Sequence, residues 1–270
     1  MNPPSDLKAL YDAHKGLVSD KWDLYLEEYN DLFSPHRLQK LNMLEIGVQN
    51  GGSLEIWAKY FSQANRIIGC DINPLCKDIN FANEAIRFVP GDINSANTIE
   101  AIHKHAPALD IIIDDGSHIS SDIVGAFSSL FPLLADSGTY VIEDLHCSYW
   151  SRFEGGLARN NSAISFLKAL IDIVNFEHWG TAQRRQDLLE QFEAAQNLTD
   201  NDLASIHSVS FSNSLCIIKK KSKERNILGK RWVVGEIENV ALSKHAHGTY
   251  SKAELQQPHP LVGQPNTSDD

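Results

Sequence analysis

The sequence of 270 residues carries a formal net charge of −11, from 35 acidic side chains against 24 basic ones. This excess of acid argues against a surface for nucleic acid or anionic membrane, because such surfaces depend on clustered Lys and Arg. Hydrophobic residues make up 42% of the chain, which is enough for a sizeable globular core. Four scattered cysteines, no apolar leader and no bilayer-length apolar run predict a reduced, cytoplasmic protein.

The first 40 residues are polar and aromatic, and they predict a helical lead-in with helices near Leu7–His14 and Leu24–Leu32. Short apolar runs then alternate with amphipathic segments, as expected for a parallel sheet covered on both faces. The runs that predict strands are Asn42–Val48, Arg66–Asp71, Ile86–Asp92, Leu109–Asp115 and Thr139–Leu145. The segments that predict helices between them are Gly52–Ser62, Ser95–His105 and Ser121–Leu134.

After Trp150 the pattern changes to two predicted helices and two β-like runs, at Ala163–Trp179, Gln183–Gln196, Ile206–Phe211 and Ser214–Lys219. The link between the last two is so short that it joins only antiparallel strands. A mostly parallel α/β sheet that ends in such a hairpin is suggestive of methyltransferases rather than dehydrogenases. We expect one domain over residues 41–220, an extension over 221–250 and a disordered tail over 251–270.

A glycine-rich loop follows the first predicted strand, at the sheet edge where ligands of α/β folds bind. It runs from Glu45 through Gly47 and Gly51 to Ser53. A dinucleotide requires the spacing G-x-G-x-x-G, and the three residues between Gly47 and Gly51 do not fit it. S-adenosylmethionine (SAM) has no phosphate, and its cationic sulfonium tolerates an acidic loop. The spacing therefore favours SAM.

Acidic residues end the next strands as well. Asp71 ends the second predicted strand, where a carboxylate accepts hydrogen bonds from both hydroxyls of an adenosine ribose. Gly91 and Asp92 end the third, in a position to flank an adenine ring. Asp114, at the end of the fourth, is also assigned to the cofactor site.

Carboxylates gather at the ends of the fourth and fifth predicted strands. Asp114 and Asp115 end one strand, and Glu143 and Asp144 end the next. Crowded carboxylates repel unless a cation neutralises them, and oxygen ligands without thiolates suit Mg²⁺, Mn²⁺ or Ca²⁺. Because neighbouring residues of an ideal strand point to opposite faces, not all four acids can bind one ion. We predict that Asp115, Glu143 and Asp144 are the ligands, since Glu143 and Asp144 lie where the strand breaks into a loop. The alternative is that single acids cap the following helices.

His118 follows Asp115 by three residues in a Gly-Ser turn, and we predict that it is a general base for an acceptor hydroxyl. A divalent cation lowers the pKa of a hydroxyl bound to it, and a vicinal diol would chelate through two oxygens. His146, Tyr149 and Trp150 are expected beside the acceptor, where aromatic faces stack on a sugar.

The motifs EIGVQNGGS, GCDIN, IIIDDGSH, FPLLADSGTYVIEDL and SYW resemble the metal-dependent sugar O-methyltransferases of macrolide and polyketide biosynthesis, the mycinamicin and macrocin type. The resemblance spans roughly Asp20 to Lys220. It implies a Rossmann-like class I methyltransferase fold with SAM and Mg²⁺ as cofactors, and an enzyme of antibiotic biosynthesis. By the same resemblance Lys21, Trp22, Tyr25 and Tyr29 help to close the cofactor pocket, although core packing also explains these aromatics.

The resemblance leaves the acceptor open. Mycinamicin-type members carry a large N-terminal domain that completes the acceptor site, and this sequence has no counterpart to it. A deoxysugar on a polyketide and a sugar of a surface polysaccharide therefore fit as well as a macrolide. A homo-oligomer is expected at the family level only. The competing hypotheses are a metal-independent or catechol-type methyltransferase, an NAD-binding sugar oxidoreductase and a non-catalytic SAM-binding module.

Overall fold

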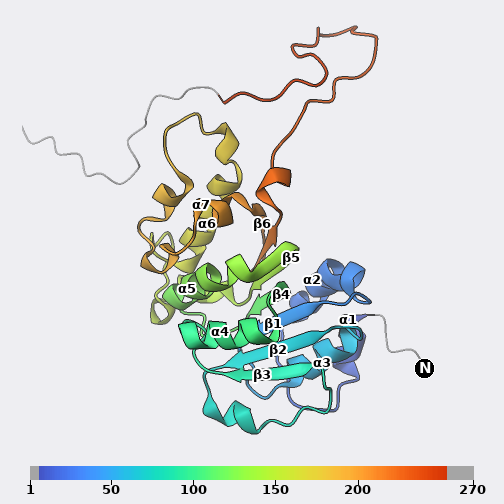
Figure 1. The fold of residues 1–270 in the computed structure, drawn as a ribbon, viewed down its shortest axis with the longest axis vertical. Helices are drawn as coiled ribbons and strands as arrows, with labels where there is room; N and C mark the ends of the chain where they lie inside the picture. The colour runs from blue at the N-terminus through green and yellow to red at the C-terminus, as the bar shows by residue number, and fades with distance from the viewer. Residues whose placement is uncertain (1–5, 254–270) are drawn as a thin grey trace, which may run out of the picture.

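The computed structural model describes residues 6–253, and a seven-stranded sheet lies at its centre (Figure 1). The strands are β1 (Asn42–Ile46), β2 (Arg66–Asp71), β3 (Ile86–Pro90), β4 (Leu109–Asp114), β5 (Leu134–Ile142), β6 (Ile206–Ser212) and β7 (Leu215–Lys220). Their order across the sheet is β3-β2-β1-β4-β5-β7-β6. The first five run parallel, and β7 is antiparallel to both β5 and β6. The predicted fold class, with its C-terminal hairpin, is confirmed.

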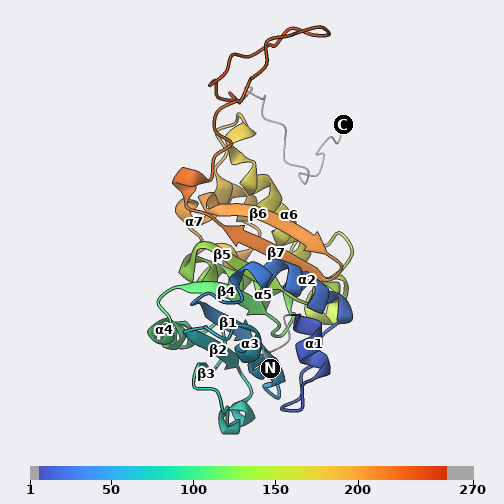
Figure 2. The same cartoon turned by 90° about the vertical axis from the view of Figure 1, so that its right-hand side faces the viewer.

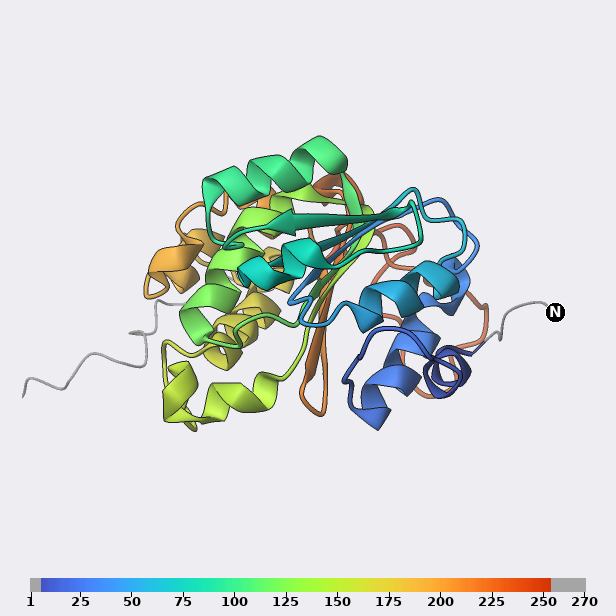
Figure 3. The same cartoon turned by 90° about the horizontal axis from the view of Figure 1, so that it is seen from below.

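Helices cover both faces of the sheet, which is seen along one edge in Figure 3. One face carries α1 (Leu7–Asp12), α2 (Asp23–Phe33) and α3 (Gly52–Tyr60). The other carries α4 (Ala96–His105), α5 (Ser120–Leu130), α6 (Ala163–Val174) and the short α7 (Asp200–Ala204). Side chains alternate along each strand, so Leu44 of β1 joins the core under α4–α6 while Met43 joins the core under α1–α3.

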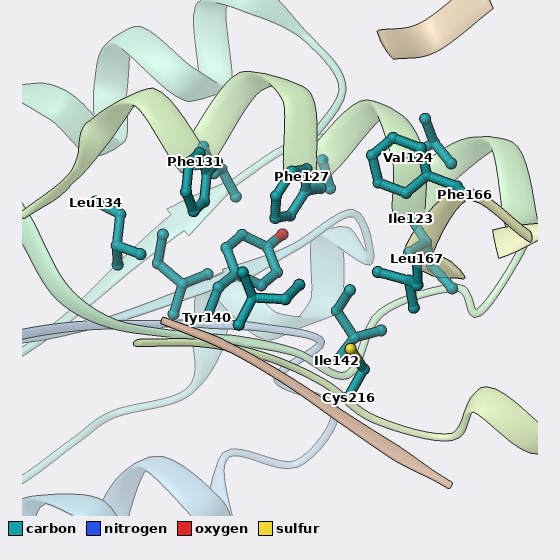
Figure 4. Close-up of a cluster of buried hydrophobic side chains, with 14 of the residues drawn as sticks. Ile123, Val124, Phe127, Phe131, Leu134, Tyr140, Ile142, Phe166, Leu167 and Cys216 are labelled. Atoms are coloured by element: carbon teal, nitrogen blue, oxygen red, sulfur yellow. The ribbon is translucent and has the colours of Figure 1, made fainter. Parts of the chain in front are cut away.

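The hydrophobic core under α5 shows how α5 and α6 pack on the sheet (Figure 4). The ring of Phe127 in α5 lies 5.2 Å from the ring of Tyr140 in β5 and 5.5 Å from that of Phe166 in α6, measured between centroids. All three side chains are fully buried. Aromatic rings in edge-to-face contact add stabilisation beyond the area they bury. This packing fixes α5 and α6 on the sheet, in which β5 pairs with β4 as far as Ile142 and Asp114.

The prediction of an α-helix over Gln183–Gln196 is wrong. The structure has two short 3₁₀ turns there, Arg185–Leu189 and Glu193–Ala195. Leu189, Phe192 and Ala195 are buried at intervals of three residues. That period matches the three residues per turn of a 3₁₀ helix rather than the 3.6 of an α-helix.

Several other boundaries differ from expectation. The helix predicted over Ala163–Trp179 ends at Val174 and is followed by a 3₁₀ turn, Phe176–His178. The helix predicted over Ser121–Leu134 ends at Leu130, where Phe131–Leu133 form a 3₁₀ turn that contains Pro132. Strand β5 begins earlier than predicted, at Leu134, and its register against β4 shifts between the partners of Leu109 and Ile111.

The described chain ends at residue 253, so the predicted disordered tail lies outside the described residues except for residues 251–253. Among the described helices none is long and apolar enough to serve as a membrane span.

Candidate functional site

A cavity of about 260 Å³ opens at the carboxyl ends of the parallel strands. This is the edge at which ligands of α/β sheets bind. Five of the eight residues predicted to contact the cofactor are among those that line the cavity: Gly47, Asp71, Gly91, Asp92 and Asp114. Ile123 and Ala126 of α5 form part of its apolar wall.

Asp71 ties the end of β2 to the loop that follows β1. Its Oδ2 accepts hydrogen bonds from the backbone N–H groups of Val48 at 2.8 Å and Gln49 at 2.9 Å. Its Oδ1 accepts one from Asn73 at 2.8 Å. The carboxylate that was predicted to meet a ribose thus also shapes the loop at the cavity wall.

Asp114 presents an unsatisfied acceptor at the cavity. Its side chain is buried, and Oδ2 has no hydrogen-bond partner among the described residues. Burial raises the pKa of this carboxyl to about 7, while the backbone N–H of Gly116 partly opposes the shift. A buried acceptor without a partner is costly, so this oxygen fits a ligand that brings a donor.

Gly47 allows the loop after β1 to pass close to the end of β4. Its φ is +85°, and a Cβ added there would lie 2.0 Å from the carbonyl oxygen of Asp115. A side chain at residue 47 would therefore collide with backbone.

We expect Gly47→Ala to lower the free energy of unfolding by about 1–3 kcal/mol, because the alanine would be strained and the clash would displace the end of β4. Urea unfolding measures the change. The matched control is Gly229→Ala, which also has a positive φ of +80° but meets no atom within 4 Å. An equal loss in both variants would show that backbone strain alone, and not the close approach, accounts for the effect.

Glu45, Gly51 and Ser53 were also predicted to contact the cofactor, but they are not among the residues that line the cavity. Glu45 is fully buried on the opposite face of β1 and accepts a hydrogen bond from Ser53 Oγ at 2.7 Å. Gly51 precedes α3 in the left-handed conformation, with the ring of Phe81 over it. Their assignment as cofactor contacts stays a prediction.

A buried lysine lies among the acids of three strands. The side chain of Lys21 is 2% exposed, and its Nζ forms ion pairs with Asp115, with Glu143 Oε1 at 2.7 Å and with Glu45 Oε1 at 3.5 Å. Tyr29 OH donates to the same Glu143 oxygen at 2.7 Å. The lead-in segment is thereby joined to the ends of β1, β4 and β5.

Three carboxyl groups face one ammonium group in this cluster. Burial raises the pKa of Glu143 to about 8, with Lys21 opposing the shift, and burial also raises the pKa values of Glu45 and Asp115. Burial alone would lower the pKa of Lys21, but the surrounding carboxylates raise it well above its ordinary value. Lys21 therefore stays charged and offsets part of the repulsion among these carboxylates.

Asp115, His118 and Asp144 form a second group, with one potential ligand atom of each lying within 4.8 Å of the others. His118 Nε2 is 3.9 Å from Asp115 Oδ1 and 3.8 Å from Asp144 Oδ2. His118 and Asp144 both have left-handed backbone, with φ of 59° and 54°. Such conformations are costly outside glycine and gather at functional sites. Two of the three predicted metal ligands meet the predicted base here, whereas Glu143 is directed toward Lys21 and Tyr29.

Aromatic residues of the lead-in segment hold Asp144 in place. Trp22 Nε1 and Tyr25 OH donate to Asp144 Oδ1 at 3.0 and 2.8 Å. His146 Nδ1 hydrogen-bonds Ser214 Oγ at 2.6 Å and lies 3.9 Å from Asp144 Oδ1. Its ring stands between Trp22 and Trp150, with centroids 6.1 and 5.0 Å away.

The aromatic rings near this group are partly exposed, although the guanidinium of Arg152 lies over the ring of Trp150, 5.1 Å from its centroid. Trp22 is 59% exposed, and Tyr149 and Trp150 are each 45% exposed. Exposed aromatic faces beside a polar site suit stacking on a sugar, as the sequence predicts for Tyr149 and Trp150. The contacts of Lys21 and Tyr25 with the acids were not predicted from sequence. The resemblance implied only that these two residues help to close the cofactor pocket.

The comparison with known proteins bears on this geometry. No protein-family model matches the sequence. The chain is 32% identical over 214 residues to 8-demethyl-8-alpha-L-rhamnosyl tetracenomycin-C 2'-O-methyltransferase of Streptomyces olivaceus, covering 76% of this chain and 52% of that protein. Over this stretch the chain is similar to a sugar O-methyltransferase. The chain is also 29% identical over 237 residues to mycinamicin VI 2''-O-methyltransferase of Micromonospora griseorubida. The match covers 83% of this chain and 55% of that protein.

The structural comparison finds the same group. The MycE methyltransferase of the mycinamycin pathway, solved in complex with Mg and SAH, matches with a TM-score of 0.67 and 26% identity over 82% of this chain and 55% of that chain. The fold of this chain is therefore that of a class I methyltransferase. It spans about half the length of the curated relatives that it matches.

Proposed function

We propose that this protein is a SAM-dependent O-methyltransferase that uses a carboxylate-bound Mg²⁺, or Mn²⁺, to methylate a hydroxyl of a sugar on a natural product or polysaccharide. One observation carries the proposal. Asp115 lines the cavity at the strand ends and also belongs to the Asp115, His118 and Asp144 group. A methyl donor in the cavity and a cation in the acidic group would therefore be neighbours.

The residues present fit both cofactors. Carboxylates without thiolates suit Mg²⁺ or Mn²⁺, with Asp115 and Asp144 as ligands. Glu143, the third predicted ligand, would have to turn from Lys21 and Tyr29 to reach the ion. The unsatisfied Oδ2 of Asp114 suits the ammonium group of SAM. Relatives with named activities methylate sugars of tetracenomycin and mycinamicin compounds, and MycE was solved with Mg and SAH.

The side chains divide the chemistry between them. When bound, Mg²⁺ would lower the pKa of an acceptor hydroxyl, and SAM would supply the methyl group as an electrophile. His118 would accept the hydroxyl proton at Nε2. Trp22 and Tyr25 hold Asp144 through its Oδ1, and the faces of Tyr149 and Trp150 would orient the sugar ring. Fixing the reacting groups in this way contributes much of the rate acceleration.

A methyl-transfer screen over glycosylated acceptors, with Mg²⁺ and with EDTA, tests the proposal. We expect turnover of glycosides that EDTA abolishes and that added Mg²⁺ restores. Activity that survives EDTA would favour a metal-independent enzyme, and turnover of catechols alone would favour the catechol type.

Calorimetry with SAM and with NAD separates the remaining alternatives. We expect SAM to bind and NAD not to bind, because the loop between Gly47 and Gly51 lacks the spacing for a pyrophosphate. Binding of NAD would favour a sugar oxidoreductase. Binding of SAM without turnover on any hydroxyl acceptor would favour a binding module.

A further inference from the structure

The segment after β7 leaves the body of the protein. Residues 221–253, here called the C-terminal arm, run away from the sheet and turn back at a distance from it (Figures 1 and 2). Asn226 and Leu228 anchor its base, through hydrogen bonds to the backbone of Ile206 and to Glu177. Beyond Leu228 the hydrogen bonds given by the described residues stay within the arm, such as Arg231 N–H to Thr249 O at 2.8 Å.

The arm exposes large apolar side chains along its length. Eight of them are at least 59% exposed: Ile227, Leu228, Trp232, Val234, Ile237, Val240, Leu242 and Tyr250. Trp232 is 83% exposed and Val240 is fully exposed. Soluble monomers rarely present so many apolar side chains on one segment, and such a surface normally marks an interaction site.

The charge of the arm is opposite to that of the body. Residues 221–253 hold seven Lys and Arg against three Glu, whereas residues 1–220 hold 17 Lys and Arg against 29 Asp and Glu. The acids of the body also gather locally. A hollow of about 260 Å³ at α1 and α2 is lined by Asp6, Asp23, Glu27 and Asp31, with Lys8 as the only basic side chain among its lining residues.

We propose that the C-terminal arm docks on the acidic body of a second copy of this chain, so that two copies exchange arms. The body complements the arm in charge, and docking removes the exposed apolar side chains from water. Exchange between two copies is reciprocal and closes the assembly as a symmetric dimer. An anionic membrane fits less well, because Glu236 and Glu238 interrupt the apolar stretch and the body itself is acidic.

Light scattering coupled to size-exclusion chromatography of the full chain tests this inference, independently of methyl transfer. We expect twice the chain mass of 30.1 kDa. Trp232→Ser combined with Ile237→Ser should raise the dimer dissociation constant by about tenfold or more, and Lys230→Glu with Arg231→Glu should do the same. Because these side chains are exposed in the single chain, the variants should keep its far-ultraviolet circular dichroism spectrum.

The control is Leu38→Ser, which removes a side chain that is 75% exposed outside the arm, and it should leave the dimer intact. A full chain that is monomeric at micromolar concentrations would overturn the inference. So would an unchanged dimer in the arm variants. Sedimentation with vesicles of phosphatidylcholine and phosphatidylglycerol tests the alternative partner, an anionic membrane. Binding of a monomer to these vesicles through the C-terminal arm would also overturn the inference.

Discussion

His118→Asn is expected to lower the rate of methyl transfer by about 10²- to 10⁴-fold, the range that a positioned general base contributes. The imidazole lies 3.8 Å from Asp144 Oδ2 and 3.9 Å from Asp115 Oδ1, beside the group proposed to hold the metal. Asparagine suits the test because residue 118 has a φ of 59°, and asparagine tolerates left-handed backbone better than most side chains. The substitution should remove the base without straining the turn.

Single-turnover kinetics with saturating SAM and a glycoside acceptor measures this loss, and calorimetry measures SAM binding, which should stay unchanged. His103→Asn, an exposed histidine in the last turn of α4, is the matched control and should turn over at the normal rate. Normal turnover in His118→Asn would refute the assigned role. A parallel loss of SAM affinity would show that the effect is structural.

Lys21→Met is expected to lower the free energy of unfolding by about 3–5 kcal/mol, the usual effect of removing one partner of a buried ion pair. The ammonium group is 2% exposed and is the cation nearest to Glu45, Asp115 and Glu143 in the structure as described. Methionine keeps the bulk of the side chain but leaves buried carboxyl groups without compensation. Urea unfolding followed by circular dichroism measures the change.

Lys15→Met, which alters an exposed lysine of the same segment, should change stability by less than about 0.5 kcal/mol. Adding Glu45→Gln to Lys21→Met should restore part of the loss, because one uncompensated carboxyl group is removed. An unfolding midpoint of Lys21→Met equal to that of the unaltered protein would contradict the role of Lys21 as the internal counter-charge.

Much of the sheet could be predicted because its strands are local features. Arg66–Asp71 was predicted and observed with the same boundaries, since a strand buried on both faces appears as one uninterrupted apolar run. The meeting of Asp115 with Asp144 also followed from sequence, because neighbouring parallel strands end at the same edge. The prediction of an α-helix over Gln183–Gln196 failed because, over a short segment, burial at every third residue resembles the 3.6-residue period of an α-helix.

The sequence by itself determined the class of the sheet, the edge that holds the site and the acids that lie there. These depend on apolar periodicity and on which residues end each strand, and both are written in consecutive residues. Tertiary structure alone decided that Lys21 and Tyr29 engage Glu143, that Trp22 and Tyr25 hold Asp144, and that Glu45 faces away from the cavity. Such pairings join residues more than 100 positions apart, and only the packing of the lead-in segment against the strand ends brings them together.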